Sequence, residues 1–150
     1  MNTPLENQHL EQVLLTALAA LTRDDVRPWV EMFAPEGIQE FPYAPAGNPT
    51  RLVGKPAVAA YLADYTKMVH LHHIGPCTFR HSADATVVEF TAEGHAVPTG
   101  NQFTMQYVSI IEHQGGKITR YIDYWNPLVA LAALGGQAAL SELGKSVLAV

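Results

Sequence analysis

The stretch of sequence that decides the fold is Gly116-Lys-Ile-Thr-Arg-Tyr-Ile-Asp-Tyr-Trp-Asn-Pro-Leu-Val-Ala-Leu-Ala-Ala-Leu-Gly135. Its first half alternates as a β-strand does, so Tyr121, Asp123 and Trp125 share one face. Asn126-Pro127 ends the strand, and a proline can begin a helix. A carboxylate on an aromatic face needs hydrogen bonds, or it binds its proton more tightly. Such groups are typical of sites where chemistry or ligand recognition takes place.

The residues before this stretch also alternate with a period of two. We predict four strands, at residues 71–80, 86–97, 102–113 and 117–125. Good turn-forming sequences join them, namely Ser82-Ala-Asp, Pro98-Thr-Gly-Asn and Gln114-Gly-Gly. After the last strand we predict a helix over residues 127–134, capped by Gly135-Gly136, and a final amphipathic helix that ends near residue 148.

The N-terminal part of the chain is predicted to be mainly helical. Thr3-Pro-Leu-Glu6 is typical of a helix start, and apolar residues then recur at helical spacing over residues 10–21. A second helix is predicted at about residues 25–33, a strand at 38–43, a loop at 44–53, and a third helix that begins at residues 54–56. Helices followed by a run of antiparallel strands predict an α+β fold with helices packed on one face of a sheet.

Composition limits the possible functions. The chain has 150 residues, of which 48% are hydrophobic and 15% charged, with a net charge of −5. One domain of this length can bury a real core, and the apolar excess indicates a cavity or an oligomer interface as well. The absence of a Lys/Arg cluster argues against a nucleic-acid partner. No apolar run has transmembrane length and no secretion signal is seen, so we expect no membrane partner and a cytoplasmic location. The single cysteine, Cys77, excludes an internal disulfide framework.

Three segments of the chain carry a family resemblance: Ile38-Gln-Glu-Phe-Pro-Tyr-Ala-Pro, Val97-Pro-Thr-Gly and the stretch at 116–135. Over roughly residues 5–135, the chain resembles the SnoaL-like polyketide cyclase group of the nuclear transport factor 2-like, or ketosteroid isomerase-like, superfamily. It is also similar to the phenazine-biosynthesis A/B proteins and to limonene epoxide hydrolase. The resemblance implies a cone-shaped single domain over residues 1–150, in which a strongly curved, mostly antiparallel sheet encloses a pocket. Residues 136–150 would be a C-terminal helical extension.

The resemblance assigns roles only at matching positions. In the cyclases, the epoxide hydrolase and the phenazine proteins, an acidic residue of the last strand acts as acid or base, and this role falls on Asp123. The position of the ketosteroid isomerase base holds Phe41 here, and that enzyme's protonated Asp falls on Tyr107. Two residues with which the epoxide hydrolase positions its water fall on Ile38 and Glu40. We therefore expect neither the catalytic residues of ketosteroid isomerase nor the full set of catalytic residues of the epoxide hydrolase.

Asp123 is the first of four predicted catalytic residues, which are Asp123, Glu40, Tyr107 and His73. Burial of Asp123 against aromatic rings would raise its pKa towards the working pH of a general acid or base. The alternatives are an ion pair with a nearby arginine such as Arg120, or exposure at a sheet edge. Glu40 could be a second carboxylate, but Gln39 and Glu40 point to opposite faces, and the sequence leaves open which one points inward. Tyr107 could donate to an oxyanion, or it could be a core tyrosine.

The histidines at 70, 72 and 73 suggest metal binding, but no third ligand follows at a recognisable spacing. We therefore expect no metal and no cofactor. If residues 71–80 form a strand, His72 or His73 must point into the concave face. Glu89 and Glu93 are predicted to lie on a polar outer face. The predicted substrate-binding residues are Trp29, Phe41, Tyr43, His72, Met105, Tyr121 and Trp125.

These observations favour a cofactor-independent enzyme that acts on a small hydrophobic carbonyl compound or a polycyclic metabolite. The expected chemistry is proton transfer at carbon by Asp123, leading to isomerisation or an aldol-type cyclisation. Three alternatives stay open. They are an epoxide-hydrolase-like enzyme with an Asp-activated water, a non-catalytic binding protein, and an interaction module whose apolar sheet face is used for dimerisation and leaves no cavity. The family resemblance and the apolar composition together imply a homodimer formed through the sheet.

Overall fold

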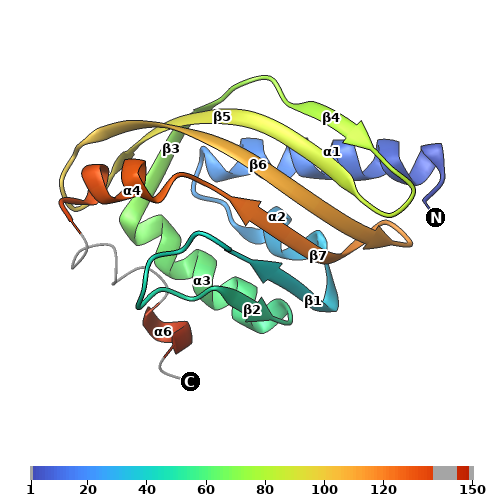
Figure 1. Cartoon of the computed structure of the whole chain (residues 1–150), viewed down its shortest axis with the longest axis horizontal. Helices are drawn as coiled ribbons and strands as arrows, with labels where there is room; N and C mark the ends of the chain where they lie inside the picture. The colour runs from blue at the N-terminus through green and yellow to red at the C-terminus, as the bar shows by residue number, and fades with distance from the viewer. Residues whose placement is uncertain (1, 137–144, 149–150) are drawn as a thin grey trace.

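The computed structural model describes residues 2–136 and 145–148 (Figure 1). Its helices are α1 (Pro4–Leu21), α2 (Arg27–Glu31), α3 (Lys55–Met68), α4 (Pro127–Leu134) and α6 (Lys145–Leu148). Its strands are β1 (Phe33–Glu40), β2 (Arg51–Val53), β3 (Val69–Ile74), β4 (Thr78–His81), β5 (Thr86–Ala96), β6 (Gln102–Gln114) and β7 (Lys117–Tyr124).

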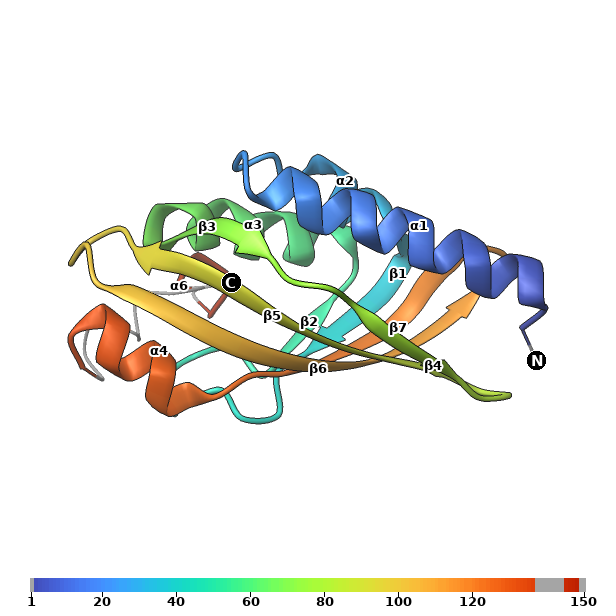
Figure 2. The ribbon, with the colours of Figure 1, turned by 90° about the horizontal axis from the view of Figure 1, so that it is seen from above.

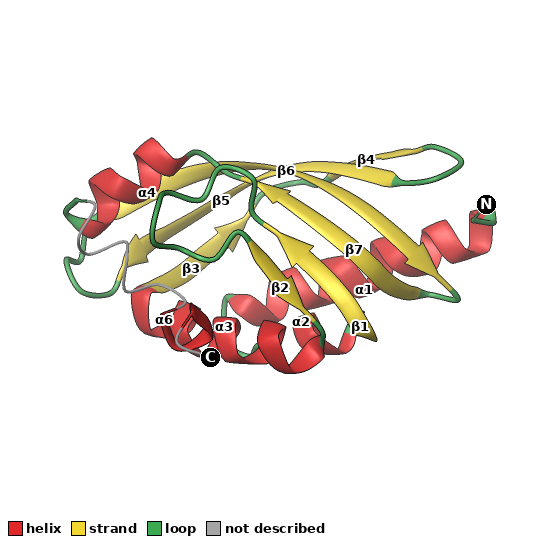
Figure 3. Cartoon of the chain, turned by 60° about the horizontal axis from the view of Figure 1, so that its bottom comes forward, coloured by secondary structure: helices red, strands yellow, loops and turns green. Residues whose placement is uncertain are grey.

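One curved sheet organises the described residues. Its strand order is β2-β1-β7-β6-β5-β3, and β4 pairs with the part of β5 that β3 leaves free. The pair of β1 and β7 is parallel, and the other recorded pairs are antiparallel. Helices α1, α2 and α3 cover one face, whereas α4 lies at the end of the sheet near the β5–β6 turn (Figures 2 and 3). The predicted α+β class with a curved, mostly antiparallel sheet is confirmed.

Local sequence explains why α1 forms and how it packs. The Thr3 hydroxyl accepts a hydrogen bond from the Glu6 amide, and the Thr3 amide donates to the Glu6 carboxylate, at 3.1 and 2.7 Å. This capping box satisfies two amide groups that a helix start would leave unpaired. Leu10, Leu14 and Leu18 recur on the buried face of α1, as their spacing predicts. The helix therefore supplies one wall of the core.

The predicted boundaries between residues 25 and 53 need correction. The second helix is shorter than predicted, because the chain becomes extended at Phe33, which pairs with Ile118 of β7. Strand β1 ends at Glu40 and not at residue 43. The end of the predicted loop is the short strand β2, where Leu52 is buried and pairs with Gln39 of β1. Tertiary pairing, which single-sequence patterns do not show, decides these boundaries.

The predicted strand at residues 71–80 is two strands in the structure. Gly75 and Pro76 interrupt it, and the Gly75 amide donates to the carbonyl oxygen of Thr91 at 2.7 Å. Strand β3 then pairs with one half of β5 and β4 with the other half. The other three predicted strands of this region match β5, β6 and β7 to within one residue at each end.

Helix α4 has the predicted bounds, and Gly135 ends it in the left-handed conformation that glycine favours. Within the predicted C-terminal extension at residues 136–150, α6 is described, and residues 137–144 and 149–150 lie outside the described part. Among the described residues, no helix has the length and apolar character needed to cross a membrane.

Candidate active site

Alternation along β7 sends three predicted side chains to the same cavity. Tyr121, Asp123 and Trp125 line it, whereas Ile122 and Tyr124 point to the opposite face. Asp123 stands directly opposite Ser109 of β6 in the antiparallel register. The prediction that these three side chains share one inner face is confirmed.

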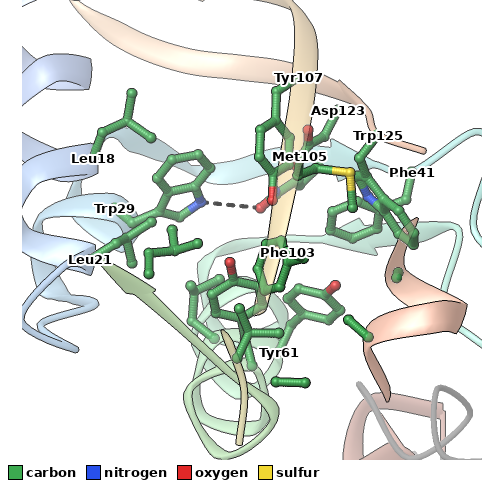
Figure 4. A pocket seen from close by; sticks show the side chains of 18 of the residues that line it. Leu18, Leu21, Trp29, Phe41, Tyr61, Phe103, Met105, Tyr107, Asp123 and Trp125 are labelled. Carbon is green, nitrogen blue, oxygen red and sulfur yellow. Dashed lines mark hydrogen bonds between the residues drawn. The ribbon is translucent and has the colours of Figure 1, made fainter. Parts of the chain in front are cut away.

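The cavity has a volume of about 100 Å³ and lies between the sheet and helices α1 to α4 (Figure 4). Its wall is largely aromatic and aliphatic. The aromatic lining residues are Trp29, Phe41, Tyr61, Tyr65, Phe90, Phe103, Tyr107, Tyr121 and Trp125. Asp123 and Gln39 supply a carboxylate and an amide, and the lining residues that the structure describes include no Lys, Arg or His. A few polar groups in an apolar cavity are typical of a small-molecule site.

Near neutral pH, the carboxyl group of Asp123 is present in both its ionised and its protonated form. Removal of its carboxyl group from bulk water raises the pKa of Asp123 from 3.8 to about 7, and a hydrogen bond from Gln39 partly opposes this rise. The cause is the cost of placing a charge in an apolar cavity. A carboxyl group with this pKa can both take up and release a proton at physiological pH.

Gln39 is a site residue that sequence reasoning left undecided. The Trp29 indole N–H donates to Oε1 of Gln39 at 3.3 Å, so the amide oxygen faces Trp29. The amide nitrogen is then free to donate to Asp123, which agrees with the lowering effect of Gln39 on the pKa of Asp123. Gln39 is only 2% exposed. Trp29 and Gln39 together orient the carboxylate.

The prediction that Glu40 lies beside Asp123 as a second carboxylate is wrong. Because Gln39 takes the inward position on β1, Glu40 points outward, where its carboxylate pairs with Nε of Arg120. Nη1 of Arg120 also donates to Glu112 at 3.1 Å. The alternative ion pair between Asp123 and Arg120 is therefore absent.

Tyr107 lines the cavity as predicted, together with two tyrosines of α3 that the sequence analysis did not assign to the site. The hydroxyl groups of Tyr65 and Tyr107 are hydrogen-bonded to each other. Burial raises the pKa of Tyr61, Tyr65 and Tyr107, and the nearby Asp123 raises it further. All three phenols therefore keep their protons at neutral pH and can act as hydrogen-bond donors.

The histidine placements are also corrected. His72 and His73 are both exposed and neither lines the cavity, because Leu71 occupies the inward position on β3. A register shift between Leu71 and His73 breaks the alternation that would have turned His73 inward. Nε2 of His72 lies 2.7 Å from Nδ1 of His95 on the surface. Among the described residues, no group of three or more His, Cys, Asp or Glu side chains is arranged to hold a metal ion.

Of the remaining predicted substrate-binding residues, Trp29, Phe41 and Met105 line the cavity. Tyr43 does not, since it is 61% exposed and its ring packs edge-on against Tyr124 at 5.2 Å between centroids.

The two glutamates of β5 follow the predicted polar outer face. Glu89 accepts from Arg80 at 2.6 Å, and Glu93 is exposed.

A curved, mostly antiparallel sheet covered by helices on one face, with one carboxylate in an apolar cavity, places the chain among the cone-shaped α+β proteins. Residues 15–121 match the family model described as SnoaL-like domain. The chain therefore belongs to the SnoaL-like family, and the resemblance seen in the sequence is confirmed.

Relatives and solved structures agree with this assignment. The chain is 40% identical to the uncharacterized protein YesE of Bacillus subtilis over 133 residues (87% of this chain, 90% of that protein). It is 33% identical over 135 residues to a PhzA/B-like protein of Pseudomonas aeruginosa (89% and 95%). A Bacillus subtilis structure, provisionally assigned as an isomerase, has a TM-score of 0.85 at 39% identity (91% and 98%). A provisionally assigned polyketide cyclase from Pseudomonas putida shares the fold at 17% identity, with a TM-score of 0.68 (81% and 94%).

Proposed function

We propose that this protein is an isomerase- or cyclase-type enzyme that transfers a proton at carbon in a compact hydrophobic carbonyl compound, without a cofactor. The observation that carries the proposal is Asp123, a carboxyl group with a pKa of about 7 that faces an apolar cavity. The similarity to a structure provisionally assigned as an isomerase supports the same reaction type.

In the proposed mechanism, the ionised Asp123 removes a proton from the carbon next to the substrate carbonyl. The electron pair of the broken C–H bond moves onto the carbonyl oxygen and gives an enolate. If the substrate has a C=C bond between its β- and γ-carbons, the enolate is conjugated with it. Return of the proton from Asp123 to the γ-carbon then shifts the double bond to the α,β position, re-forms the carbonyl and completes an isomerisation. In a cyclisation, the enolate carbon attacks a second carbonyl carbon of the same molecule, and the resulting alkoxide takes the proton.

The enolate oxygen needs a hydrogen-bond donor, and the tyrosine pair can supply one. Tyr65 and Tyr107 carry two hydroxyl protons, and the bond between them uses one. The other proton is free to be donated to the substrate oxygen. A preorganised donor in a site of low dielectric constant stabilises developing negative charge more effectively than water does.

The cavity volume favours a compact substrate. About 100 Å³ is less than the ~150 Å³ of an apolar cavity that holds benzene. A polycyclic metabolite would have to extend beyond the cavity. Of the two predicted substrate classes, the small hydrophobic carbonyl compound is therefore preferred. Epoxide hydrolysis is less well supported, because neither of the two positions that would place the water lines the cavity: Ile38 is apolar, and Glu40 pairs with Arg120.

Deuterium exchange tests the proposal without knowledge of the substrate. Small cyclic ketones and enones are incubated in D₂O with the wild-type protein, and deuterium at the α-carbon is followed by NMR. We expect exchange with at least one compound and its loss in Asp123→Asn. The matched control is Asp84→Asn, which changes an exposed aspartate of the β4–β5 turn. Exchange that persists in Asp123→Asn would show that another group moves the proton. If ligands bind without any exchange, the protein is a binding protein.

We also infer that the chain forms a homodimer through the sheet face that points away from the helices. Val87 of β5 and Ile110 of β6 are paired in register on this face, and the nearby Tyr43 is 61% exposed. Ile110→Glu should convert a dimer into a monomer in analytical ultracentrifugation. A monomeric wild-type protein at micromolar concentration would contradict this inference. The cytoplasmic location stays a prediction.

A further inference from the structure

The cavity combines many aromatic side chains with a single charged group. Nine aromatic side chains surround one carboxylate, and the described lining residues include no cationic side chain. Removal from water raises the pKa of Asp123, the hydrogen bond from Gln39 partly opposes this rise, and no cationic side chain contributes to the shift. An ionised Asp123 therefore stands in this cavity without a counter-ion.

We propose that the cavity binds a compact tertiary or quaternary ammonium ion, with Asp123 as counter-ion and the aromatic rings as its walls. This inference goes beyond the proposed function and holds whether or not the protein catalyses a reaction. Ring faces attract cations through their quadrupoles at distances of up to about 6 Å, and aromatic cages recognise quaternary ammonium groups in this way. An anionic ligand would meet the Asp123 carboxylate without any balancing positive charge.

The aromatic wall is rigid enough to act as a cage. Phe41 and Tyr61 are stacked at 4.8 Å between ring centroids, and Phe90 and Tyr107 are stacked at 5.0 Å. Each ring of a stacked pair has one face covered by its partner, which fixes its orientation. Asp123 is seen among the rings of Tyr107, Trp125 and Phe41 in the close view (Figure 4). An alkylammonium ion in the cavity would thus contact apolar ring surface and the carboxylate together.

Binding of such a cation must be coupled to the protonation of Asp123. The groups that face it are Gln39 of β1, Tyr61 and Tyr65 of α3, Tyr107 of β6 and Tyr121 of its own strand, and the tyrosines all remain protonated at neutral pH. A cation favours the ionised carboxylate, so binding below pH 7 releases a proton. The affinity for a permanently charged ligand should then fall about tenfold per pH unit below pH 7 and level off above it.

Choline and its neutral isostere 3,3-dimethylbutan-1-ol provide a test, because they differ mainly in a charged nitrogen in place of a carbon. Isothermal titration calorimetry of the full chain at pH 8 should show choline binding at least tenfold more tightly than the isostere. Between pH 8 and pH 5, choline affinity should fall by more than about tenfold, while isostere affinity changes little.

Asp123→Asn should remove the preference for choline and its pH dependence but keep isostere binding, which also shows that the variant is folded. Asp84→Asn should behave as the wild type. Equal affinity of the wild type for both compounds at pH 8, or no binding of choline, would overturn the proposal. Neither compound has to be turned over, so these results are independent of the deuterium-exchange test of the proposed function.

Discussion

Replacement of Asp123 by asparagine should stabilise the fold at alkaline pH. In the folded protein the pKa of Asp123 is raised from 3.8 to about 7, so the folded state binds this proton more tightly than the unfolded state. The resulting contribution to stability is fully present below pH 3.8 and is lost as the pH rises through 7. Asparagine has no such proton and does not bear this loss.

The magnitude follows from the difference between the two pKa values. About three pKa units at about 1.36 kcal/mol per unit give a loss of about 4 kcal/mol between pH 3.5 and pH 8.5. This value is an upper bound, since water that enters the cavity would stabilise the ion. It is still a large fraction of the ~5–15 kcal/mol that keeps a typical domain folded.

Urea unfolding of the wild type and of Asp123→Asn at several pH values measures this effect. As the pH rises, Asp123→Asn should gain stability relative to the wild type. The gain in the free energy of unfolding should reach up to about 4 kcal/mol and should occur mainly between pH 4 and pH 7. Comparison across pH cancels any constant effect of the amide, and Asp84→Asn should show no such trend. A difference that is independent of pH would refute the assignment of a raised pKa to Asp123.

Three further predictions concern other residues. Gln39→Leu removes the hydrogen bond that favours the ionised Asp123, so the NMR titration midpoint of that carboxyl group should rise by about 1–2 pH units. His113 is buried with both ring nitrogens unpaired, and burial lowers its pKa, so this residue should contribute a loss of stability as the pH falls below 6.5. The melting temperature of His113→Leu should therefore rise relative to that of the wild type between pH 7.5 and pH 5 in thermal unfolding. Thr99→Val removes a 2.6 Å hydrogen bond to the carbonyl oxygen of Ala133 and should cost about 1 kcal/mol in chemical unfolding.

Local patterns predicted the parts of the fold and site that depend on neighbouring residues. The capping box at Thr3 and the alternation that turns Asp123 inward are set within a few positions, and both agree with the structure. The inward orientation of Gln39 and the outward orientation of Glu40 could not be predicted in this way. These orientations depend on the parallel register of β1 against β7, which lies about 80 residues away in the chain. No pattern in residues 38–43 contains that information.

The same reasoning explains two other differences. His73 would face inward in a regular strand, but the irregularity after Leu71 in its pairing with β5 leaves it exposed. Tyr65 has the spacing of a core residue on α3, and its place in the candidate site depends on the contact of its hydroxyl group with Tyr107 of β6. Irregular pairing and contacts between distant segments are therefore what the sequence analysis missed.

The position of β7 in the sheet has a consequence for biosynthesis. β7 lies between β1 and β6, and it pairs with both. While the ribosome makes the chain, β1 and β6 each present an unpaired edge until residues 117–124 have emerged. Exposed strand edges invite pairing with other chains, and distant pairings form slowly. The segment that carries Asp123 is thus also the one whose late arrival ends the period of greatest aggregation risk for the nascent chain.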